Sequence, residues 1–363
     1  MLTIVRYVDY PLPDPALLPA DPEQILFFDI ETTGFSPASS SLYLIGTMVQ
    51  EQGRMKLTQW FATLMSEEEE ILAAFGEYLT HYSCLIHFNG DQFDIPYLEK
   101  CAGAYRMTLP FSSCDSFDLL KKAREQKELL HLSSYRQKSI EQFLGIQRDD
   151  LYDGGQLIPV YQQYLRSQTE ELLHLLLLHN AEDVTGMLQL LPILAYEKAA
   201  ASLASASLEH WEKSKNALSI TLKGCIFVPV PVTLQKDGFF LQMEQNLIVI
   251  RIPLFHGELK YYYPDYKDYY YLPQEDMAIH QKVACFVDKE HRKKATRTTA
   301  YTRKSGVFLK LPSSIKEPPV FQEKELLCLK TDLKAKDRFV TLEEREDYLL
   351  LIGQYAAASL LTK

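Results

Sequence analysis

Residues 25–34 read ILFFDIETTG, a short apolar run that ends in two acidic residues and a polar turn. An apolar run of this length, followed by turn residues, predicts a buried strand. Asp29 and Glu31 are two positions apart, so a strand directs both side chains to the same face. Carboxylates this close repel each other, and divalent cations with oxygen ligands relieve the repulsion. The stretch predicts a metal site, although an acidic pair after a strand is also common without a metal.

The neighbouring segments predict a mixed sheet with helices packed on it. Strands are expected first as a meander and then in alternation with helices, which is typical of an α/β domain. The expected strands are residues 25–30, 41–50, 56–63, 84–88 and 112–118. The expected helices are residues 66–79, 93–104, 139–145 and 169–194. Residues 1–20 are rich in proline and are expected to form an extended lead-in to a domain that covers residues 21–195.

A third carboxylate lies in FNGDQFDIPYL, residues 88–98. Asn89 and Gly90 predict a turn, and Pro96 is suited to the first turn of a helix, so Asp94 stands at a strand-turn-helix junction. Two interpretations remain open from these residues. Asp94 is either the N-cap of the helix or a third acidic ligand.

A fourth carboxylate lies in HNAEDV, residues 179–184, inside an apolar helix. His179 and Asp183 are four positions apart and therefore share one helix face. Burying an aspartate on an apolar helix is costly unless charged partners are present. A lone histidine in such a helix is by default a satisfied core or surface residue, so only the combination with the other acidic segments indicates a site.

Taken together, DIETTG, FNGDQFDIPYL and HNAEDV resemble the three motifs of the DEDD 3'→5' exonuclease family. The resemblance covers about residues 21–195 and is to the YprB-like branch and the proofreading domains of family B DNA polymerases. It implies a ribonuclease H-like fold and hydrolysis of single-stranded DNA or RNA from the 3' end, with release of nucleoside 5'-monophosphates.

The resemblance also assigns roles to residues. Two Mg²⁺ or Mn²⁺ ions are expected to activate water and stabilise the leaving oxygen, and His179 is expected to orient that water or accept its proton. The expected ligands are Asp29, Glu31, Asp94 and Asp183. Thr32, Thr33 and Asn89 are expected either to contact the terminal nucleotide or only to complete their turns.

The third motif departs from both branches of the family. One branch has Tyr, three residues and Asp, and the other has His, four residues and Asp. Here three residues separate His179 from Asp183, so the spacing of one branch is combined with the residue of the other. One residue of slip turns a helical side chain by about 100°, so His179 is expected either to orient water as the tyrosine does, to act as a weaker base, or to do neither.

Residues 196–363 predict a second, β-rich α+β domain, with helices expected at residues 278–287 and 342–360. Residues 289–304 hold seven Lys and Arg against one Glu, and Arg292, Lys293 and Lys294 are candidate phosphate contacts. A solvated charged surface explains this stretch equally well. The tyrosine-dense residues 261–273 offer base-stacking surfaces, but strands that fill a core are the favoured interpretation.

Charge and composition limit the class of protein. Residues 1–195 carry 13 Lys and Arg against 27 Asp and Glu, so cations are expected to bind there before a polyanion approaches. We find no apolar run long enough for a membrane span and no secretory signal, and the six scattered cysteines fit a reducing cytoplasm. Besides an exonuclease, an endonuclease on the same fold and a nucleic-acid-binding protein with a degenerate site remain open.

Overall fold

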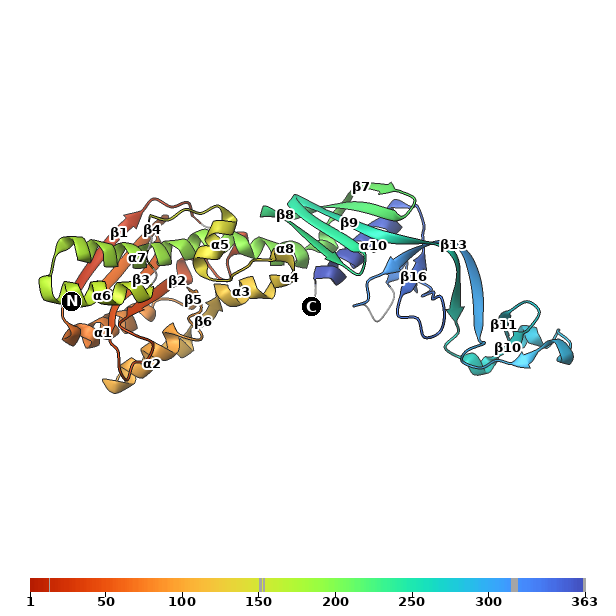
Figure 1. Ribbon diagram of the computed structural model, residues 1–363, viewed down its shortest axis with the longest axis horizontal. Coiled ribbons are helices and arrows are strands. Elements are labelled where there is room, and N and C mark those ends of the chain that lie inside the picture. The colour runs from red at the N-terminus through yellow and green to blue at the C-terminus, as the bar shows by residue number, and fades with distance from the viewer. Residues whose placement is uncertain (13, 150–151, 153, 315–318, 362–363) are drawn as a thin grey trace. The chain divides into compact units, whose positions relative to one another are not determined.

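The computed structural model describes residues 1–12, 14–149, 152, 154–314 and 319–361. The chain divides into two compact units, Met1–Tyr196 and Glu197–Lys363. Their elements are labelled in Figure 1, and each unit is described by itself below.

The N-terminal unit is built on a six-stranded sheet with the strand order β1-β4-β3-β2-β5-β6. Strands β1, β4, β3 and β2 pair antiparallel, whereas β5 pairs parallel with both β2 and β6. The sheet is therefore mixed, as the sequence predicts. Its strands are β1 (Leu2–Val8), β2 (Ile25–Thr32), β3 (Leu42–Glu51), β4 (Arg54–Phe61), β5 (Cys84–His87) and β6 (Asp115–Asp118).

The expectation of an extended lead-in over residues 1–20 is wrong for its first part. Leu2–Val8 forms the edge strand β1, which pairs with β4 from Leu2 opposite Phe61 to Val8 opposite Met55. The prolines of this region begin at Pro11, so the first residues retain every backbone donor that a strand needs. Further along, Pro15–Leu17 and Pro22–Gln24 form single 3-10 turns before β2 begins.

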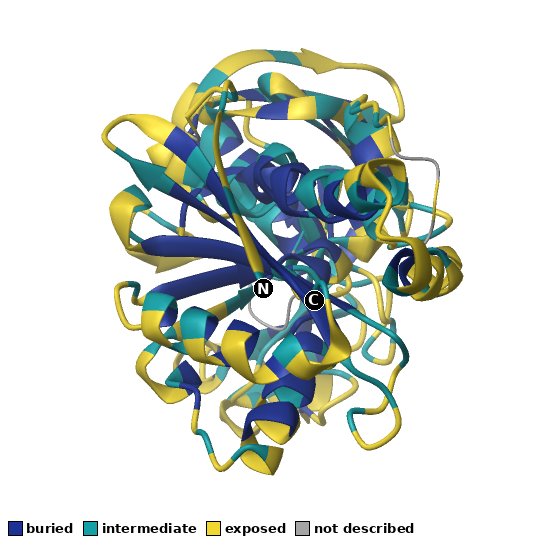
Figure 2. Ribbon diagram, turned by 90° about the vertical axis from the view of Figure 1, so that its left-hand side faces the viewer, coloured by how far each residue is buried: buried dark blue, intermediate teal, exposed yellow. Residues whose placement is uncertain are grey.

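Helices cover both faces of this sheet (Figure 1). Helix α7 (Glu170–Leu190) packs on β2, β3 and β4 and carries α6 (Gly154–Ser167) beside it, while α1 (Glu68–Leu79) packs on β3 and β4 from the other face. The remaining helices of the unit are α2 (Asp94–Ala104), α3 (Leu119–Glu125), α4 (Lys127–Leu130) and α5 (Gln137–Leu144), and α8 (Ala195–Ala201) spans the boundary. Figure 2 shows the buried strands between helices whose outer surfaces are exposed.

Aromatic side chains fill the core on both sides of the sheet. Phe28 of β2 contacts Phe75 of α1 with ring centroids 5.7 Å apart. Tyr43 of β3 stacks on Tyr161 of α6 with centroids 4.1 Å apart. Because these residues lie in adjacent strands and pack against different helices, the sheet is fixed from both faces, and so is the end of β2 that carries Asp29 and Glu31.

The C-terminal unit is β-rich, as predicted. Its main sheet has the order β16-β13-β9-β8-β7, and its strands pair antiparallel. Helix α10 (Glu346–Leu361) packs on this sheet, where a Cβ atom at Gly353 would lie 2.8 Å from Ile220. The strands are β7 (Ser207–Lys213), β8 (Ala217–Lys236), β9 (Phe239–Tyr262), β13 (Tyr301–Leu311) and β16 (Arg338–Thr341).

A smaller sheet, β11-β10-β12, is inserted between β9 and β13. It contains β10 (Tyr269–Leu272), β11 (Met277–His280) and β12 (Lys293–Lys294). The expected helix over residues 278–287 is wrong in its first turn, because those residues pair with β10, and only α9 (Gln281–Ala284) is helical. A hairpin of β14 (Val320–Phe321) and β15 (Lys324–Glu325) completes the unit.

Within the described residues, no helix combines the length and the apolar character needed to cross a bilayer.

Candidate metal centre

A cleft of about 360 Å³ opens at the end of β2. It is bordered by the last residues of β2, the loop after β5, the beginnings of α2, α5 and α6, and the middle of α7. Asp29, Glu31, Asp94, His179 and Asp183 all line it. The three acidic segments of the sequence, which are far apart along the chain, therefore meet at one place.

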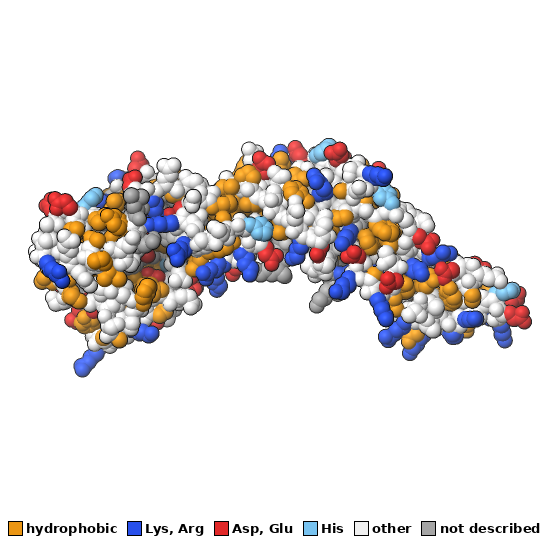
Figure 3. Space-filling model, in the orientation of Figure 1, with side chains coloured by type: hydrophobic (Ala, Val, Ile, Leu, Met, Phe, Trp, Pro, Cys, Tyr) orange, Lys and Arg blue, Asp and Glu red, His pale blue; other side chains and the backbone are white. Residues whose placement is uncertain are grey.

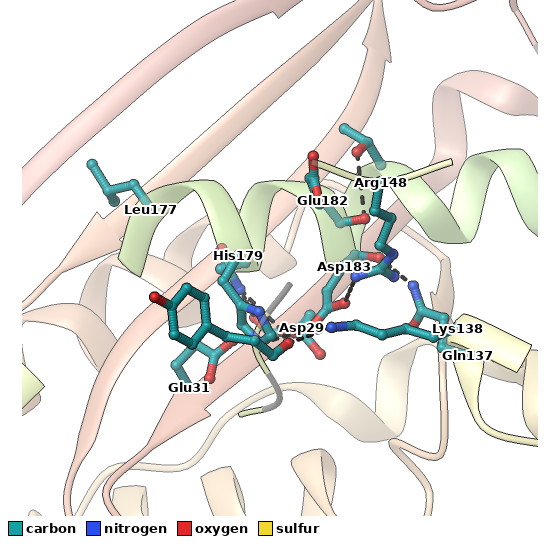
Figure 4. A network of polar contacts seen from close by, with 12 residues as sticks. Asp29, Glu31, Gln137, Lys138, Arg148, Leu177, His179, Glu182 and Asp183 are labelled. Carbon is teal, nitrogen blue, oxygen red and sulfur yellow. Dashed lines mark hydrogen bonds and ion pairs between the residues drawn. The ribbon is translucent and has the colours of Figure 1, made fainter. Parts of the chain in front are cut away.

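Glu31, His179 and Asp183 form the tightest group in the cleft. Nε2 of His179 lies 3.4 Å from Oε1 of Glu31 and 3.3 Å from Oδ2 of Asp183. One ligand atom from each residue lies within 4.8 Å of the others, which is close enough for a shared metal ion. Figure 4 shows Glu31 on the strand and His179 and Asp183 on the helix directed into the same space. Because both neighbours of Nε2 are carboxylates, we assign the ring hydrogen to this nitrogen.

Asp29 is held by a chain of two buried amides. Nδ2 of Asn180 donates to Oδ2 of Asp29 over 3.0 Å, and Nε2 of Gln59 donates to Oδ1 of Asn180 over 2.9 Å. Gln59 also donates to the Leu177 carbonyl, so its own orientation is fixed. Gly46 leaves the room for this arrangement, because a Cβ atom there would lie 1.9 Å from Oδ1 of Asn180.

Asp94 lies in the first turn of α2 and is buried. Burial raises the pKa of its carboxyl group to about 7, and the negative charges of Asp118 and Asp183 add to that effect. Burial also raises the pKa of Asp29 well above its usual range, and the charges of Asp183, Glu31 and Asp94 raise it further. The neighbouring carboxylates thus oppose the ionisation of both Asp29 and Asp94.

The loop that carries Asp94 is held by buried polar groups. Nδ1 of His87 accepts a hydrogen bond from the Gly90 backbone N–H over 3.0 Å, and Nε2 of His87 lies 2.7 Å from the Ser116 hydroxyl. A Cβ atom at Gly90 would lie 2.6 Å from the His87 ring, so only glycine fits. Asp118 accepts from the N–H groups of Leu120 and Asn89 and is the N-cap of α3.

The hydroxyl groups of both threonines after Glu31 are used within their turn. Thr32 donates to the Gly34 carbonyl over 2.8 Å, and Oγ1 of Thr33 accepts from the Ser41 N–H over 2.9 Å. Thr32 lines the cleft, as does Asn89, whose backbone has a φ of 68° and accepts from the N–H groups of the following turn. These hydrogen bonds support the interpretation that Thr32, Thr33 and Asn89 complete their turns.

Sequence reasoning missed several residues that border the cleft. Phe35 is 91% exposed and contacts Phe93 edge to face at 6.1 Å, which places an aromatic surface at the rim. Arg136 and Lys138, at the beginning of α5, add positive charge to the same cleft. Figure 4 shows Lys138 extending toward the carboxylates. Phe35 directly follows the DIETTG motif, so its position in the sequence could have indicated a role, whereas no local pattern marks Arg136 and Lys138 as cleft residues.

Arg292, Lys293 and Lys294 lie in the small sheet of the C-terminal unit. Arg292 donates to the Ala284 carbonyl and lies over the Tyr270 ring at 5.0 Å, and Lys294 lies over the same ring at 4.5 Å. Lys293 is exposed. Figure 3 shows positive, negative and hydrophobic side chains interspersed in the region of β10 and β11. The charged groups of Arg292 and Lys294 therefore contact residues of the C-terminal unit itself.

The tyrosines of this region pack on one another. Tyr263 stacks on Tyr269 at 4.0 Å, and the hydroxyl groups of Tyr271 and Tyr301 both donate to Asp276. These contacts are those of a packed small sheet, which agrees with the favoured interpretation of the tyrosine-dense segment as structural.

The donor set of the cleft fits hard divalent cations. Such ions take carboxylate oxygens as ligands, and they favour the ionised form of carboxyl groups whose pKa burial has raised. Carboxylate oxygens of Glu31 and Asp183 are close enough to bind one metal ion together, and Asp29 and Asp94 line the same cleft.

The fold of this unit agrees with the comparison to known families. Residues 26–195 match the model of the RNase H superfamily. This part of the chain is an RNase H-like domain. The match begins within β2 and ends at the start of α8, so it includes every acidic segment of the cleft and excludes β1.

Parts of the chain are also similar to solved structures of an exonuclease and of a DNA polymerase. Exonuclease I of E. coli in complex with a dT13 oligonucleotide is 14% identical, with 40% of this chain and 42% of that chain covered and a TM-score of 0.30. The family B DNA polymerase of the archaeon Pyrobaculum calidifontis is 12% identical, with 94% and 46% covered and a TM-score of 0.41. The chain thus spans about half the length of these structures. No curated protein matches the chain in sequence.

The RNase H-like domain should lose stability as pH rises when cations are absent. Because the folded-state pKa of Asp94 is raised to about 7, the folded state retains a proton that the unfolded state releases near pH 4. The contribution of Asp94 to the free energy of unfolding is at most about 4 kcal/mol. It is fully present below about pH 4 and is lost as the pH rises through 7. We expect added Mn²⁺ to reverse the loss and Asp94→Asn to flatten the pH dependence.

Fluorescence unfolding can follow this domain alone. The chain has two tryptophans, and in a Trp211→Phe background only Trp60, which is buried in β4, reports. Urea midpoints measured between pH 5 and 8, with EDTA or with Mn²⁺, give the dependence. An identical slope for Asp94→Asn and its parent would contradict the prediction.

Proposed function

We propose that the chain is a metal-dependent 3'→5' exonuclease that hydrolyses phosphodiester bonds of single-stranded DNA or RNA and releases nucleoside 5'-monophosphates. One observation carries the proposal. Carboxylates from three separate segments of an RNase H-like domain converge with His179 on a single cleft, where burial and mutual repulsion favour bound cations.

In this proposal the four carboxylates hold two Mg²⁺ or Mn²⁺ ions. Such ions, when bound, activate a water molecule near neutral pH and stabilise the leaving 3'-oxygen of the scissile bond. Asp29 and Glu31 contribute from β2, Asp94 from the start of α2, and Asp183 from α7. Rigid elements thus carry all four ligands, which keeps the carboxylates in place before the substrate arrives.

His179 is the proposed group for orienting the attacking water or accepting its proton. Its Nε2 lies between Glu31 and Asp183, so the short spacing of the third motif does direct the ring into the cleft. Nε2 faces two carboxylates in this arrangement, and the hydrogen assigned to it must leave before this nitrogen can accept another.

The rim of the cleft offers contacts for the end of a single strand. The exposed Phe35 ring, supported by Phe93, is proposed to stack on a terminal base, and such stacking tolerates any sequence. Arg136 and Lys138 are proposed to contact backbone phosphates. Thr32 and Asn89 are proposed to position the terminal nucleotide mainly through the turns that they form, with Thr33 supporting the first turn.

The basic segment of the C-terminal unit is proposed as a secondary phosphate contact. Lys293 is exposed and is the best placed of the three candidates, whereas Arg292 and Lys294 lie over Tyr270. Such contacts would add affinity without sequence preference.

End-labelled oligonucleotides test the proposed activity directly. With Mn²⁺, a 3'-labelled linear strand should release its label as a mononucleotide at once, while a 5'-labelled strand should shorten stepwise. EDTA should stop both reactions, and a circular single strand should remain intact. Cleavage of the circle would instead identify an endonuclease. Binding of both the linear and the circular strand without any cleavage would identify a nucleic-acid-binding protein. The Asp29→Asn/Asp183→Asn double variant controls for a contaminating nuclease.

A further inference from the structure

An arginine outside the acidic motifs contacts the carboxylate of the third one. Nη1 of Arg148 donates to Oδ1 of Asp183, while Nε and Nη2 of the same guanidinium group donate to Oε2 and Oε1 of Glu141. The arginine side chain is only 8% exposed. Figure 4 shows the Arg148 side chain directed toward Asp183.

The surroundings of this pair are shaped to hold it. Glu141 is 2% exposed, and Gln137 donates to Oε1 of Glu141 over 3.0 Å and to the Asp183 carbonyl over 2.9 Å. Gly186 provides the space on α7, because a Cβ atom there would lie 2.4 Å from Glu141 and 3.0 Å from Arg148.

The backbone brings Arg148 back to the helix that it follows. Helix α5 ends at Gly145, whose φ of 77° reverses the chain, and the N–H of Ile146 donates to the Glu141 carbonyl over 2.9 Å. The next residue after the arginine is fixed to α7, because the N–H of Asp149 donates to Oε1 of Glu182 over 3.0 Å. The backbone is therefore fixed by hydrogen bonds both before and after Arg148, which limits where its side chain can reach.

We propose that Arg148, held by Glu141, is a positioning residue that fixes the Asp183 carboxylate and presents its Oδ2 atom to a divalent cation in the cleft. This inference rests on the function proposed above. Arg148 occupies Oδ1, whereas Oδ2 is on the side of His179 and the cleft. A guanidinium group can donate two parallel hydrogen bonds to one carboxylate and a further one to a second carboxylate, a fixed geometry that a lysine cannot match.

Two other roles fit the geometry less well. The described residues that line the cleft include Asp183 but not Arg148, so the arginine is not placed to contact a substrate phosphate. A purely stabilising role is a weak explanation for a buried ion pair, because apolar residues of similar volume commonly stabilise a core equally well. Outer groups that orient metal ligands, in contrast, typically change metal affinity or activity by about 10- to 100-fold when they are replaced.

Mn²⁺ binding to the full chain, measured by calorimetry, tests the inference without relying on activity. We expect Arg148→Gln to weaken Mn²⁺ binding by about 10- to 100-fold and Arg148→Lys to weaken it less. The Glu141→Gln/Arg148→Gln double variant removes both charges, so the buried Glu141 is not left as an unpaired carboxylate, and the variant should fold while showing the same weakening. Cleavage by these variants should recover at saturating Mn²⁺, because the effect is on metal affinity.

Arg166→Gln is the matched control, since Arg166 is an exposed arginine of α6 outside the cleft. Mn²⁺ binding by the folded double variant within twofold of wild type would overturn the inference, as would an equal loss in Arg166→Gln. If wild type binds Mn²⁺ but does not cleave, the proposed function fails while the comparison of affinities still decides the role of Arg148. If wild type does not bind Mn²⁺, both proposals fail.

Discussion

Replacing Asp29 or Asp183 with asparagine is expected to reduce metal-dependent cleavage by about 1,000-fold or more, or about 4 kcal/mol in barrier height. Asparagine keeps the shape of each side chain but removes the charge that a divalent cation requires. Oδ2 of Asp29 accepts from Asn180, and an amide oxygen at that position can still accept. Initial rates on a 3'-labelled oligonucleotide over a range of Mn²⁺ concentrations measure the effect.

Stability distinguishes this loss from misfolding. The raised pKa of Asp29 means that its charge opposes folding at neutral pH without cations, so Asp29→Asn should unfold at a higher temperature than wild type in EDTA. Glu171→Gln, which changes an exposed carboxylate in the first turn of α7, is the matched control and should cleave normally. Cleavage by Asp29→Asn at wild-type rates would remove this residue from the proposed site.

Gly46→Ala is expected to produce the largest loss of stability from a single added methyl group. The new Cβ would meet Oδ1 of Asn180 at 1.9 Å and Cγ at 2.7 Å, and neither the strand nor the hydrogen-bonded amide can move freely. Overpacking of this kind costs about 1–3 kcal/mol and sometimes more. Displacement of Asn180 should also release Asp29, so Mn²⁺ affinity should fall in the same variant.

Gly103→Ala in α2 serves as the comparison, because a Cβ atom there meets nothing within 4 Å. Alanine in a helix is more favourable than glycine by about 1 kcal/mol, so this variant should be neutral or more stable. Urea unfolding followed through Trp60, together with Mn²⁺ titration, measures both effects. Equal stability of the two alanine variants would show that Asn180 is not held as described.

The parts of the site that local periodicity determines could be predicted from the sequence. The alternation of a strand places Asp29 and Glu31 on one face, and the turn of a helix places His179 above Asp183. The turn at Asn89 and Gly90 likewise follows from residue type. The mixed sheet is predictable for the same reason, because each strand and helix carries its own pattern.

Residues whose roles depend on distant parts of the chain could not be predicted. Asn180 lies beside His179 in the sequence, but its direction depends on Gly46 and Gln59 from two other strands. Arg148 precedes Asp183 by 35 positions and belongs to no recognisable motif. The edge strand β1 and the strand β11 were also missed, since only their pairing partners decide their conformation.

The crowding of carboxyl groups at the end of β2 has a consequence for cation uptake. Below about pH 7, Asp94 is expected to hold a hydrogen ion on the oxygen atoms that a cation needs, and burial beside other carboxylates also raises the pKa of Asp29. Each captured cation must then expel hydrogen ions into the solvent. Loading of the proposed metal site is therefore expected to acidify a weakly buffered solution, and mild acid alone should return the domain to its unloaded form.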